Sequence, residues 1–227
     1  MDKTPPTDIP DSSPSGDGAP AQASAGAESF ETDTDDRVRL KAMDRADLEA
    51  FVEELGQPAY RGRQLYNWLY AKGVTDFAQM SSLPKGFREQ LADVATAESF
   101  TVVRQAQSDD GTVKALFELP SGQQAEMVLI PDIDERGQAQ RLTVCVSSQV
   151  GCAMGCTFCA TGQMGFRENI PAGAIYDQVW HMNEVAQERF GKPVTNVVFM
   201  GMGEPLLNYD GVLTSLELLT DADPLNL

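Results

Sequence analysis

From residue 37 to about residue 98, apolar side chains recur at three- and four-residue intervals, a period that predicts amphipathic helices. Asp44 is placed to cap a first helix, Gly73 to end a second and Pro84 to open a third. We therefore expect a small helical accessory domain over residues 37–98. The positions expected to face its core are Leu48, Phe51, Val52, Leu55, Leu65, Trp68, Leu69, Phe87, Leu91 and Val94.

Beyond residue 99 the pattern changes to alternation, which predicts strands. Residues 100–103 and 114–117 flank the turn signal Asp109-Asp110-Gly111 and predict a hairpin. Residues 125–130 predict a further strand, which we expect to end at Pro131 and to be followed by a polar loop over 132–140. The region 99–140 is thus expected to be a β-hairpin and strand region.

Residues 141–227 show the strand–helix–strand–helix order of an α/β fold. Apolar runs at 142–146 and 194–200 predict two parallel strands buried on both faces, and helices are expected from near Pro171 and over residues 209–220. With right-handed crossovers, functional groups are expected on the loops at the carboxyl ends of these strands.

Residues 1–36 have a different composition, rich in Pro, Ser, Ala, Gly and Asp, and we expect them to be disordered. Nine acidic residues against Lys3 give this extension about half of the formal net charge of −17. The sequence shows no membrane-spanning apolar run and no signal-peptide pattern, so we expect a soluble, cytoplasmic protein. A pI near 4.3 argues against a generally basic RNA-binding surface, so any RNA must meet a local basic patch.

All four cysteines lie between residues 145 and 159. Cys152, Cys156 and Cys159 form a C-x3-C-x2-C triplet in a glycine-rich loop, and three thiolates can hold three irons of a [4Fe–4S] cluster while the fourth stays open. Zinc is the alternative, but structural zinc sites pair two such knuckles, and the only histidine is His181. A disulfide is less favoured because nothing marks the chain as secreted. The spacing favours iron–sulfur over zinc.

With Phe158 before the last cysteine, the triplet resembles the signature of radical S-adenosylmethionine (SAM) enzymes. The run from Cys145 to Cys152 and the run Gly201-Met-Gly-Glu-Pro-Leu-Leu-Asn208 resemble the adenine-C2 RNA methyltransferases of that superfamily. The resemblance implies a truncated radical-SAM partial (β/α) barrel, with only its first two strand–helix units, after the accessory domain and hairpin region. It also implies a [4Fe–4S] cluster and SAM as cofactors, 23S rRNA and tRNA as substrates, and a flavodoxin-like reducing partner.

The same resemblance implies roles for four further residues. Gly203 and Glu204 would contact SAM, Glu126 would transfer a proton at the target base, and Cys145 would resolve a protein–RNA crosslink. Without the resemblance, Glu126 is an ordinary strand carboxylate and Cys145 a small buried hydrophobe. The methyl-carrying cysteine of the family has no counterpart here, because no Cys follows Cys159 among these 227 residues.

The candidates for an RNA-contacting surface in the helical domain are Tyr60, Arg61, Arg63, Lys85 and Arg88. From the pattern alone, a solvated face with Tyr60 and Trp68 in the core is favoured, whereas the resemblance favours RNA contact. Two other functions stay open at this point. One is an adenine-C8 RNA methyltransferase of the same superfamily, and the other is a non-catalytic iron–sulfur or RNA-binding fragment.

Overall fold

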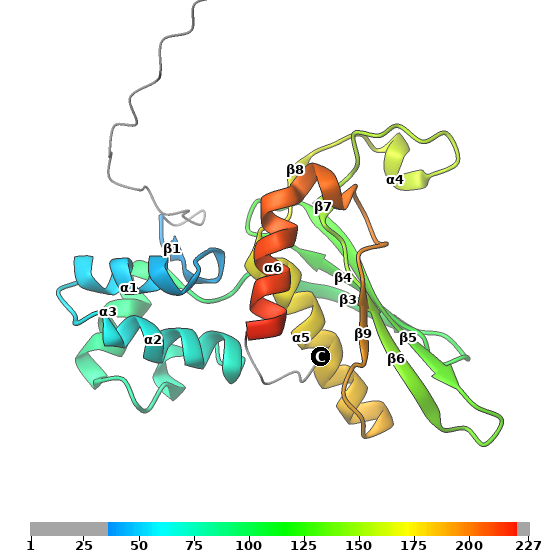
Figure 1. The fold of residues 1–227 in the computed structure, drawn as a ribbon. Coiled ribbons are helices and arrows are strands. Elements are labelled where there is room, and N and C mark those ends of the chain that lie inside the picture. Colours follow the sequence, from blue (N-terminus) through cyan, green and yellow to red (C-terminus); the bar gives the residue numbers. More distant parts are fainter. Residues whose placement is uncertain (1–35, 222–227) are drawn as a thin grey trace, which may run out of the picture.

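The computed structural model describes residues 36–221 of the chain. The acidic extension that we expect to be disordered lies outside the described residues, apart from Asp36. The described part consists of an N-terminal group of short helices and a β-sheet, with the helices α5 and α6 between them (Figure 1).

Three short helices form the N-terminal part, as the periodicity predicts. The first has a capping box, because Asp47 N donates to Asp44 Oδ1 at 2.9 Å and Asp44 N donates to Asp47 Oδ2 at 3.1 Å. A parallel ladder of β1 with β2 joins the two ends of this part. The elements are β1 (Val38–Arg39), α1 (Arg45–Glu54), α2 (Tyr60–Tyr66) with a π-helical turn (Asn67–Ala71), α3 (Lys85–Val94), β2 (Ala95–Thr96), and 3₁₀ turns at Leu40–Ala42 and Phe77–Gln79.

Within residues 36–221, the main sheet has five strands in the order β3-β4-β5-β6-β9. The strands β3 to β6 pair antiparallel, as the hairpin signals predict, and β9 pairs parallel with β6, as the strand–helix–strand order predicts. One sheet therefore contains strands from both predicted regions, and the predicted boundary at 140 lies inside β6. The strands are β3 (Thr101–Gln107), β4 (Val113–Glu118), β5 (Gln124–Ile133), β6 (Ala139–Cys145) and β9 (Asn196–Val198).

The expected strand end at Pro131 is wrong. β5 continues to Ile133, and the expected loop is a tight turn in which Asp134 N donates to Gln138 O at 3.0 Å. Proline is tolerated here because the ladder with β4 ends at Leu129, so this part of β5 pairs with β6 alone in the described sheet.

The helix α5 (Ala172–Phe190) covers one face of the sheet, and α6 (Tyr209–Asp221) packs against α5. Alternation along β5 turns Met127 and Leu129 toward the buried side and Glu126 toward the other face. The expectation that the last strand is buried on both faces is wrong. β9 is half-exposed because it is an edge of the described sheet and because α5 covers only one of the two faces of that sheet.

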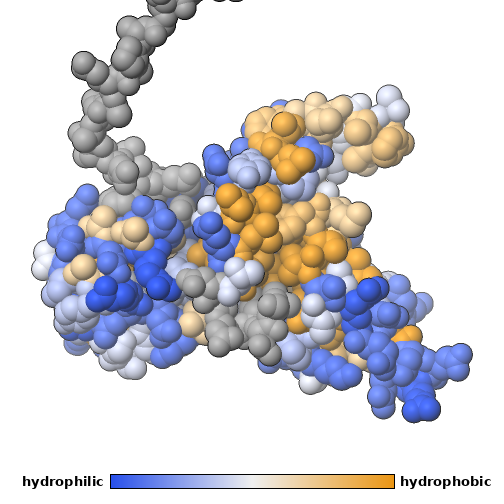
Figure 2. Space-filling model, in the orientation of Figure 1, coloured by the Kyte–Doolittle hydropathy of each residue, from blue (hydrophilic) through white to orange (hydrophobic). Residues whose placement is uncertain are grey.

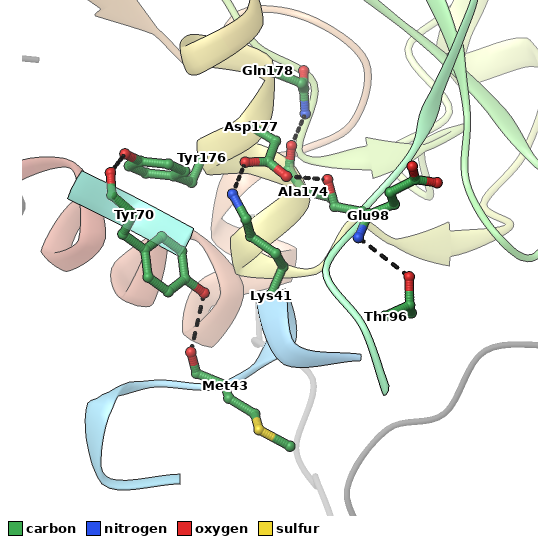
Figure 3. Close-up of polar contacts among 10 residues, drawn as sticks. Lys41, Met43, Tyr70, Thr96, Glu98, Ala174, Tyr176, Asp177 and Gln178 are labelled. Atoms are coloured by element: carbon green, nitrogen blue, oxygen red, sulfur yellow. Dashed lines mark hydrogen bonds and ion pairs between the residues drawn. The ribbon is translucent and has the colours of Figure 1, made fainter. Parts of the chain in front are cut away.

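A buried polar cluster joins the helical part to α5 (Figure 3). The Lys41 side chain is 3% exposed and its Nζ donates to Asp177 Oδ1 at 2.5 Å, while Ser99 Oγ donates to Asp177 Oδ2 at 2.5 Å. Lys41 Nζ also lies 5.1 Å from the ring centroid of Tyr70 and 5.3 Å from that of Tyr176. Tyr176 Oη donates to Tyr70 O at 2.6 Å. These contacts fix the helical part relative to α5.

Close backbone packing accompanies this cluster. A Cβ on Gly173, in the first turn of α5, would lie 1.5 Å from Lys41 O. Burial raises the pKa of the Tyr70 and Tyr176 hydroxyls, and the nearby Asp177 carboxylate adds to both shifts. Both hydroxyls therefore stay protonated and donate hydrogen bonds, Tyr70 to Met43 O at 3.1 Å.

Candidate functional site

The three cysteines of the triplet lie on one loop at the end of the sheet where β6 and β9 finish (Figure 1). The strands β7 (Gln149–Val150) and β8 (Glu168–Asn169) pair antiparallel and close the base of this cysteine loop, residues 151–167, which contains the single-turn helix α4 (Ala160–Gln163). Gly151 has a φ of 71°, and a Cβ there would lie 1.8 Å from Gly165 O. The two ends of the loop thus meet at a point that requires glycine.

The three thiols share this loop but do not converge in the structure. Cys152 is buried, Cys159 is half-buried and Cys156 is exposed. Within residues 36–221, no group of three or more His, Cys, Asp or Glu side chains is arranged to hold a metal ion. The donor set nevertheless fits an iron–sulfur cluster in its chemistry, because three thiols lie on one loop whose base is fixed. His181 lies on α5 beside Gln105 of β3, 3.4 Å from its Oε1, and not on the loop.

Backbone N–H groups favour the thiolate form of Cys159. The N–H of Gly162 contributes most and groups of Thr161 add to it, so the pKa of Cys159 is lowered. Cys159 N donates to Cys156 O at 3.1 Å, and a Cβ on Gly162 would lie 3.0 Å from Cys156 N. The turn that joins the second and third cysteines is therefore tightly wound, and it favours the ionisation state in which a thiol binds metal.

The loop that follows β9, residues Gly201–Glu204, lies beside the start of the cysteine loop, and we refer to it as the Gly-Glu loop. Gly201 N donates to Val146 O at 3.0 Å, and a Cβ on Gly201 would lie 2.6 Å from the same oxygen. Gly203 has a φ of 101°, and a Cβ there would lie 2.6 Å from Gln149 Cβ. Contacts within the chain thus require both glycines, a reason that the sequence pattern does not show.

Glu204 ends the Gly-Glu loop with its carboxylate half-buried. Its Oε1 accepts a hydrogen bond from Leu206 N at 3.2 Å and caps the 3₁₀ turn Pro205–Asn208. A carboxylate at the carboxyl end of a parallel strand, next to the cysteine loop, can pair with the ammonium group of a small ligand.

Glu126 and Cys145 lie on the open face of the sheet, which points away from α5. Cross-strand pairing places Lys114, Val128, Cys145 and Val198 in one row, and Glu126 is two residues from Val128 along β5. Lys114 Nζ lies 2.9 Å from Glu126 Oε2. The structure therefore brings Glu126 and Cys145 to adjacent strands on the same face, at the end of the sheet that carries the two loops.

The surroundings of Cys145 differ from those of the other three cysteines. Burial raises the pKa of its thiol, and a backbone hydrogen bond at Met200 opposes this shift only in part, so the neutral thiol is favoured. Two cations on this face were not among the candidate site residues predicted from the sequence. Lys114 pairs with Glu126, and Arg104 is opposite Leu116, the cross-strand neighbour of Glu126. Alternation along the strands was the only signal for either.

Tyr60 is not in the core of the helical part, so that part of the expectation is wrong, whereas Trp68 is partly buried and packs against the core. Tyr60 is 44% exposed, and the Arg61 guanidinium lies 4.8 Å from its ring centroid. Trp68 is half-buried, and Lys72 Nζ lies 3.6 Å from its ring centroid. These pairs are cation–π contacts at the surface.

Parallel strands with a three-cysteine loop and a Gly-Glu loop at their carboxyl ends define a class of fold, that of the radical SAM methyltransferases. The crystal structure of a radical SAM methyltransferase from Sphaerobacter thermophilus matches with a TM-score of 0.72 and 40% sequence identity, over 83% of this chain and 54% of that one. The expected fold class is confirmed. None of the helices within residues 36–221 is long and apolar enough to cross a membrane.

Proteins of similar sequence identify one family within this class. Residues 38–97 match the family described as "Ribosomal RNA large subunit methyltransferase N-terminal domain". A probable dual-specificity RNA methyltransferase RlmN of Salinibacter ruber is 69% identical over 85% of this chain and 52% of its own length. The dual-specificity RNA methyltransferase RlmN of Marinobacter nauticus is 44% identical over 82% of this chain and 49% of its own. The chain belongs to the RlmN family, and it spans about half the length of the curated relatives it matches.

Proposed function

We propose that this chain carries the cluster-binding and SAM-binding part of an RNA methyltransferase acting at C2 of adenine in 23S rRNA and tRNA. One observation carries the proposal. The cysteine loop and the Gly-Glu loop lie side by side at the carboxyl ends of two parallel strands, in a fold shared with a radical SAM methyltransferase.

Three cysteines would bind the cluster. Cys152, Cys156 and Cys159 would each ligate one iron of a [4Fe–4S] cluster, which leaves one iron open for the amino and carboxylate groups of SAM. Gly203 and Glu204 would contact SAM, with the Glu204 carboxylate accepting a hydrogen bond from its amino group. When bound, the cluster supplies the electron for reductive cleavage of SAM, and a flavodoxin-like protein would reduce the cluster. Such an oxygen-sensitive site and reduced thiols suit the cytoplasm.

The open face would receive the target base. Glu126 would accept or donate a proton there, and Lys114 Nζ, 2.9 Å from Glu126 Oε2, would orient the carboxylate. Cys145 would be the nucleophile that resolves the protein–RNA crosslink, and burial keeps its thiol neutral until a base removes the proton.

RNA contact would rely on local cations despite the net charge of −17. On the open face these are Lys114 and Arg104, and in the helical part they are the cation–aromatic pairs of Tyr60 and Trp68. Exposed aromatic rings beside cations suit stacking with unpaired bases and contact with phosphates. We propose residues 37–98 as an accessory RNA-contacting domain on this basis.

Anaerobic reconstitution tests the cluster assignment. We expect about four irons and four sulfides per chain, with the broad visible absorption of a cubane cluster. Replacement of Cys152, Cys156 or Cys159 by Ala should abolish iron uptake. Cys145→Ala is the matched control and should leave the iron content unchanged. Stoichiometric zinc without iron uptake would refute the assignment.

Product analysis tests the two-cysteine chemistry. The 227-residue polypeptide, reduced and supplied with SAM, should form no 2-methyladenosine. It lacks a counterpart of the methyl-carrying cysteine, because no Cys follows Cys159 among its residues. A polypeptide extended to the length of the relatives should form it, and Cys145→Ala in that longer protein should accumulate a protein–RNA crosslink. Methylation by the short polypeptide, or a Cys145→Ala variant that turns over normally, would contradict the assignment.

A further inference from the structure

The Gly-Glu loop stays hydrogen-bonded to the chain before the cysteine loop after the regular strand pairing has ended. Pairing of β6 with β9 finishes at Cys145 and Val198. Beyond it, Ser148 N still donates to Met202 O at 2.9 Å. The N–H groups of Met202 and Glu204, however, donate to side chains instead of a backbone partner.

The hydroxyl of Ser147 binds the first of these N–H groups. Ser147 is 1% exposed, and its Oγ accepts from Met202 N at 2.9 Å and donates to Glu126 O at 2.5 Å. The backbone of Ser147 is itself fixed by an amide of α5. Ser147 N donates to Gln178 Oε1 at 2.8 Å, and Gln178 Nε2 donates to Ser147 O at 3.0 Å. One buried hydroxyl therefore connects the Gly-Glu loop with the strand that carries Glu126.

The amide of Gln149 binds the second N–H group. Gln149 is 1% exposed, and its Oε1 accepts from Glu204 N at 2.9 Å. Its Nε2 donates to Asn169 Oδ1 at 2.9 Å, and Asn169 lies in β8, where the cysteine loop closes. One side chain, from the strand before the cysteine loop, thus contacts both the backbone of the Gly-Glu loop and the strand after the cysteine loop.

We propose that Ser147 and Gln149 are positioning residues that hold the Gly-Glu loop in register with the cysteine loop. They fix where the Glu204 carboxylate lies relative to the three thiols. The importance of this register rests on the proposed function, in which one SAM molecule is held between the two loops. Neither residue contacts the reacting atoms. Both side chains are buried, so truncating either one leaves a loop N–H without its partner and favours opening of the loop.

Amide hydrogen exchange of the metal-free chain tests the register directly. Gln149→Met keeps the volume of the side chain and removes both hydrogen bonds, so exchange in peptides covering residues 200–206 should accelerate about tenfold. Peptides from α1 serve as the internal reference and should be unchanged. Asn183→Leu is the matched control, because it removes one buried bond, from Val194 N to Asn183 Oδ1 at 3.0 Å, at the other end of β9.

Two further variants keep the test decisive if Gln149→Met does not fold. Ser147→Ala removes the acceptor of Met202 N–H and should accelerate exchange in the same peptides. Gln149→Glu keeps an oxygen acceptor for Glu204 N–H, and the Asn169 amide can rotate to donate to it, so protection should persist. Equal exchange in wild type and Ser147→Ala, or the same acceleration in Asn183→Leu, would overturn the proposal.

Binding of SAM to the reconstituted chain tests the consequence. Gln149→Met should weaken SAM binding about tenfold at unchanged iron content, whereas Asn183→Leu should not. A variant with a mobile Gly-Glu loop and unchanged SAM affinity would overturn the proposal. If wild type binds neither iron nor SAM, the proposed function fails, and the exchange experiment still decides whether the two side chains hold the loop.

Discussion

Removal of the Asp177 carboxylate is expected to destabilise the protein more than removal of its partner Lys41. The two side chains form a buried ion pair between the helical part and α5, with side-chain exposures of 14% for Asp177 and 3% for Lys41 (Figure 3). Asp177→Ala leaves an ammonium group almost without solvent, beside the faces of Tyr70 and Tyr176. Lys41→Met leaves a carboxylate that is partly solvated and still accepts from Ser99 Oγ at 2.5 Å.

The magnitude follows from which charge is left behind. Breaking a buried pair by removing one partner costs about 3–5 kcal/mol, and we assign Asp177→Ala to this range. For a chain of this size that corresponds to a fall in Tm of about 6–20 °C. Lys41→Met should cost less, because its side chain fills the same aliphatic volume and no buried charge is left without solvent. The double variant Lys41→Met/Asp177→Leu should recover part of the loss, since neither charge remains.

Urea denaturation of the wild type, the two single variants and the double variant measures the effect as free energy of unfolding. Equal m-values across the set would show that the same surface is exposed on unfolding, so that the differences can be compared. A Lys41→Met variant as unstable as Asp177→Ala, or a double variant less stable than Asp177→Ala alone, would show that a buried, unpaired ammonium group is not the cause of the loss.

Two further predictions concern packing and titration. Gly173→Ala should lower the free energy of unfolding by about 1–3 kcal/mol, because its Cβ would lie 1.5 Å from Lys41 O. The control is Gly86→Ala on α3, where an added Cβ would have no neighbour within 4 Å, and it should raise the free energy of unfolding by up to about 1 kcal/mol. Equal effects of the two substitutions in urea denaturation would contradict the packing argument. Burial lowers the pKa of His181 below 6.5, against an opposing effect of Glu184, so NMR of this single imidazole should show a midpoint below 6.5. The contribution of neutral His181 to stability is complete above pH 6.5 and is lost as the pH falls, because the unfolded chain binds the proton at a higher pH than the folded protein does. An NMR midpoint at or above pH 6.5 would contradict the lowered pKa.

Local signals account for the parts of the fold that the sequence predicts well. The first helix begins after Asp44 because its cap involves residues three apart, and α5 follows the spacing of Ile175, Val179 and Met182, all of which are buried. The hairpin of β3 and β4 similarly follows from a turn signal and alternation. The cysteine triplet is recognisable for the same reason, since its three residues lie within one short loop.

Contacts between distant segments account for what the sequence does not show. β5 runs through Pro131 because β4 ends where it does, a property of the partner strand and not of the proline. Ser147 and Gln149 look like ordinary polar residues after a strand, and only the fold shows that their partners lie 55 residues further along the chain. Lys41 likewise pairs with a residue 136 positions away. Pairings of this kind leave no local period or spacing.

An apolar surface lies over α6 and the turn before it, where Figure 2 shows orange residues together in the centre of the molecule. Its large exposed side chains are Met200 (81%), Leu206 (73%), Tyr209 (60%), Leu207 (49%), Leu213 (44%) and Leu216 (41%). The strand β9 beside it is an edge of the described sheet. Contiguous apolar surface next to an open strand edge favours association with another chain.

We therefore expect the 227-residue polypeptide to self-associate with rising concentration in sedimentation velocity experiments. The double variant Leu213→Glu/Leu216→Glu should shift it toward the monomer, because two charges on one face of α6 would be buried without partners in any apolar contact. Val103→Glu is the matched control, since Val103 is 51% exposed on β3, at the opposite edge of the sheet. If the control disperses the protein as well as the double variant does, general charge repulsion explains the effect, and the surface over α6 is not the site of association.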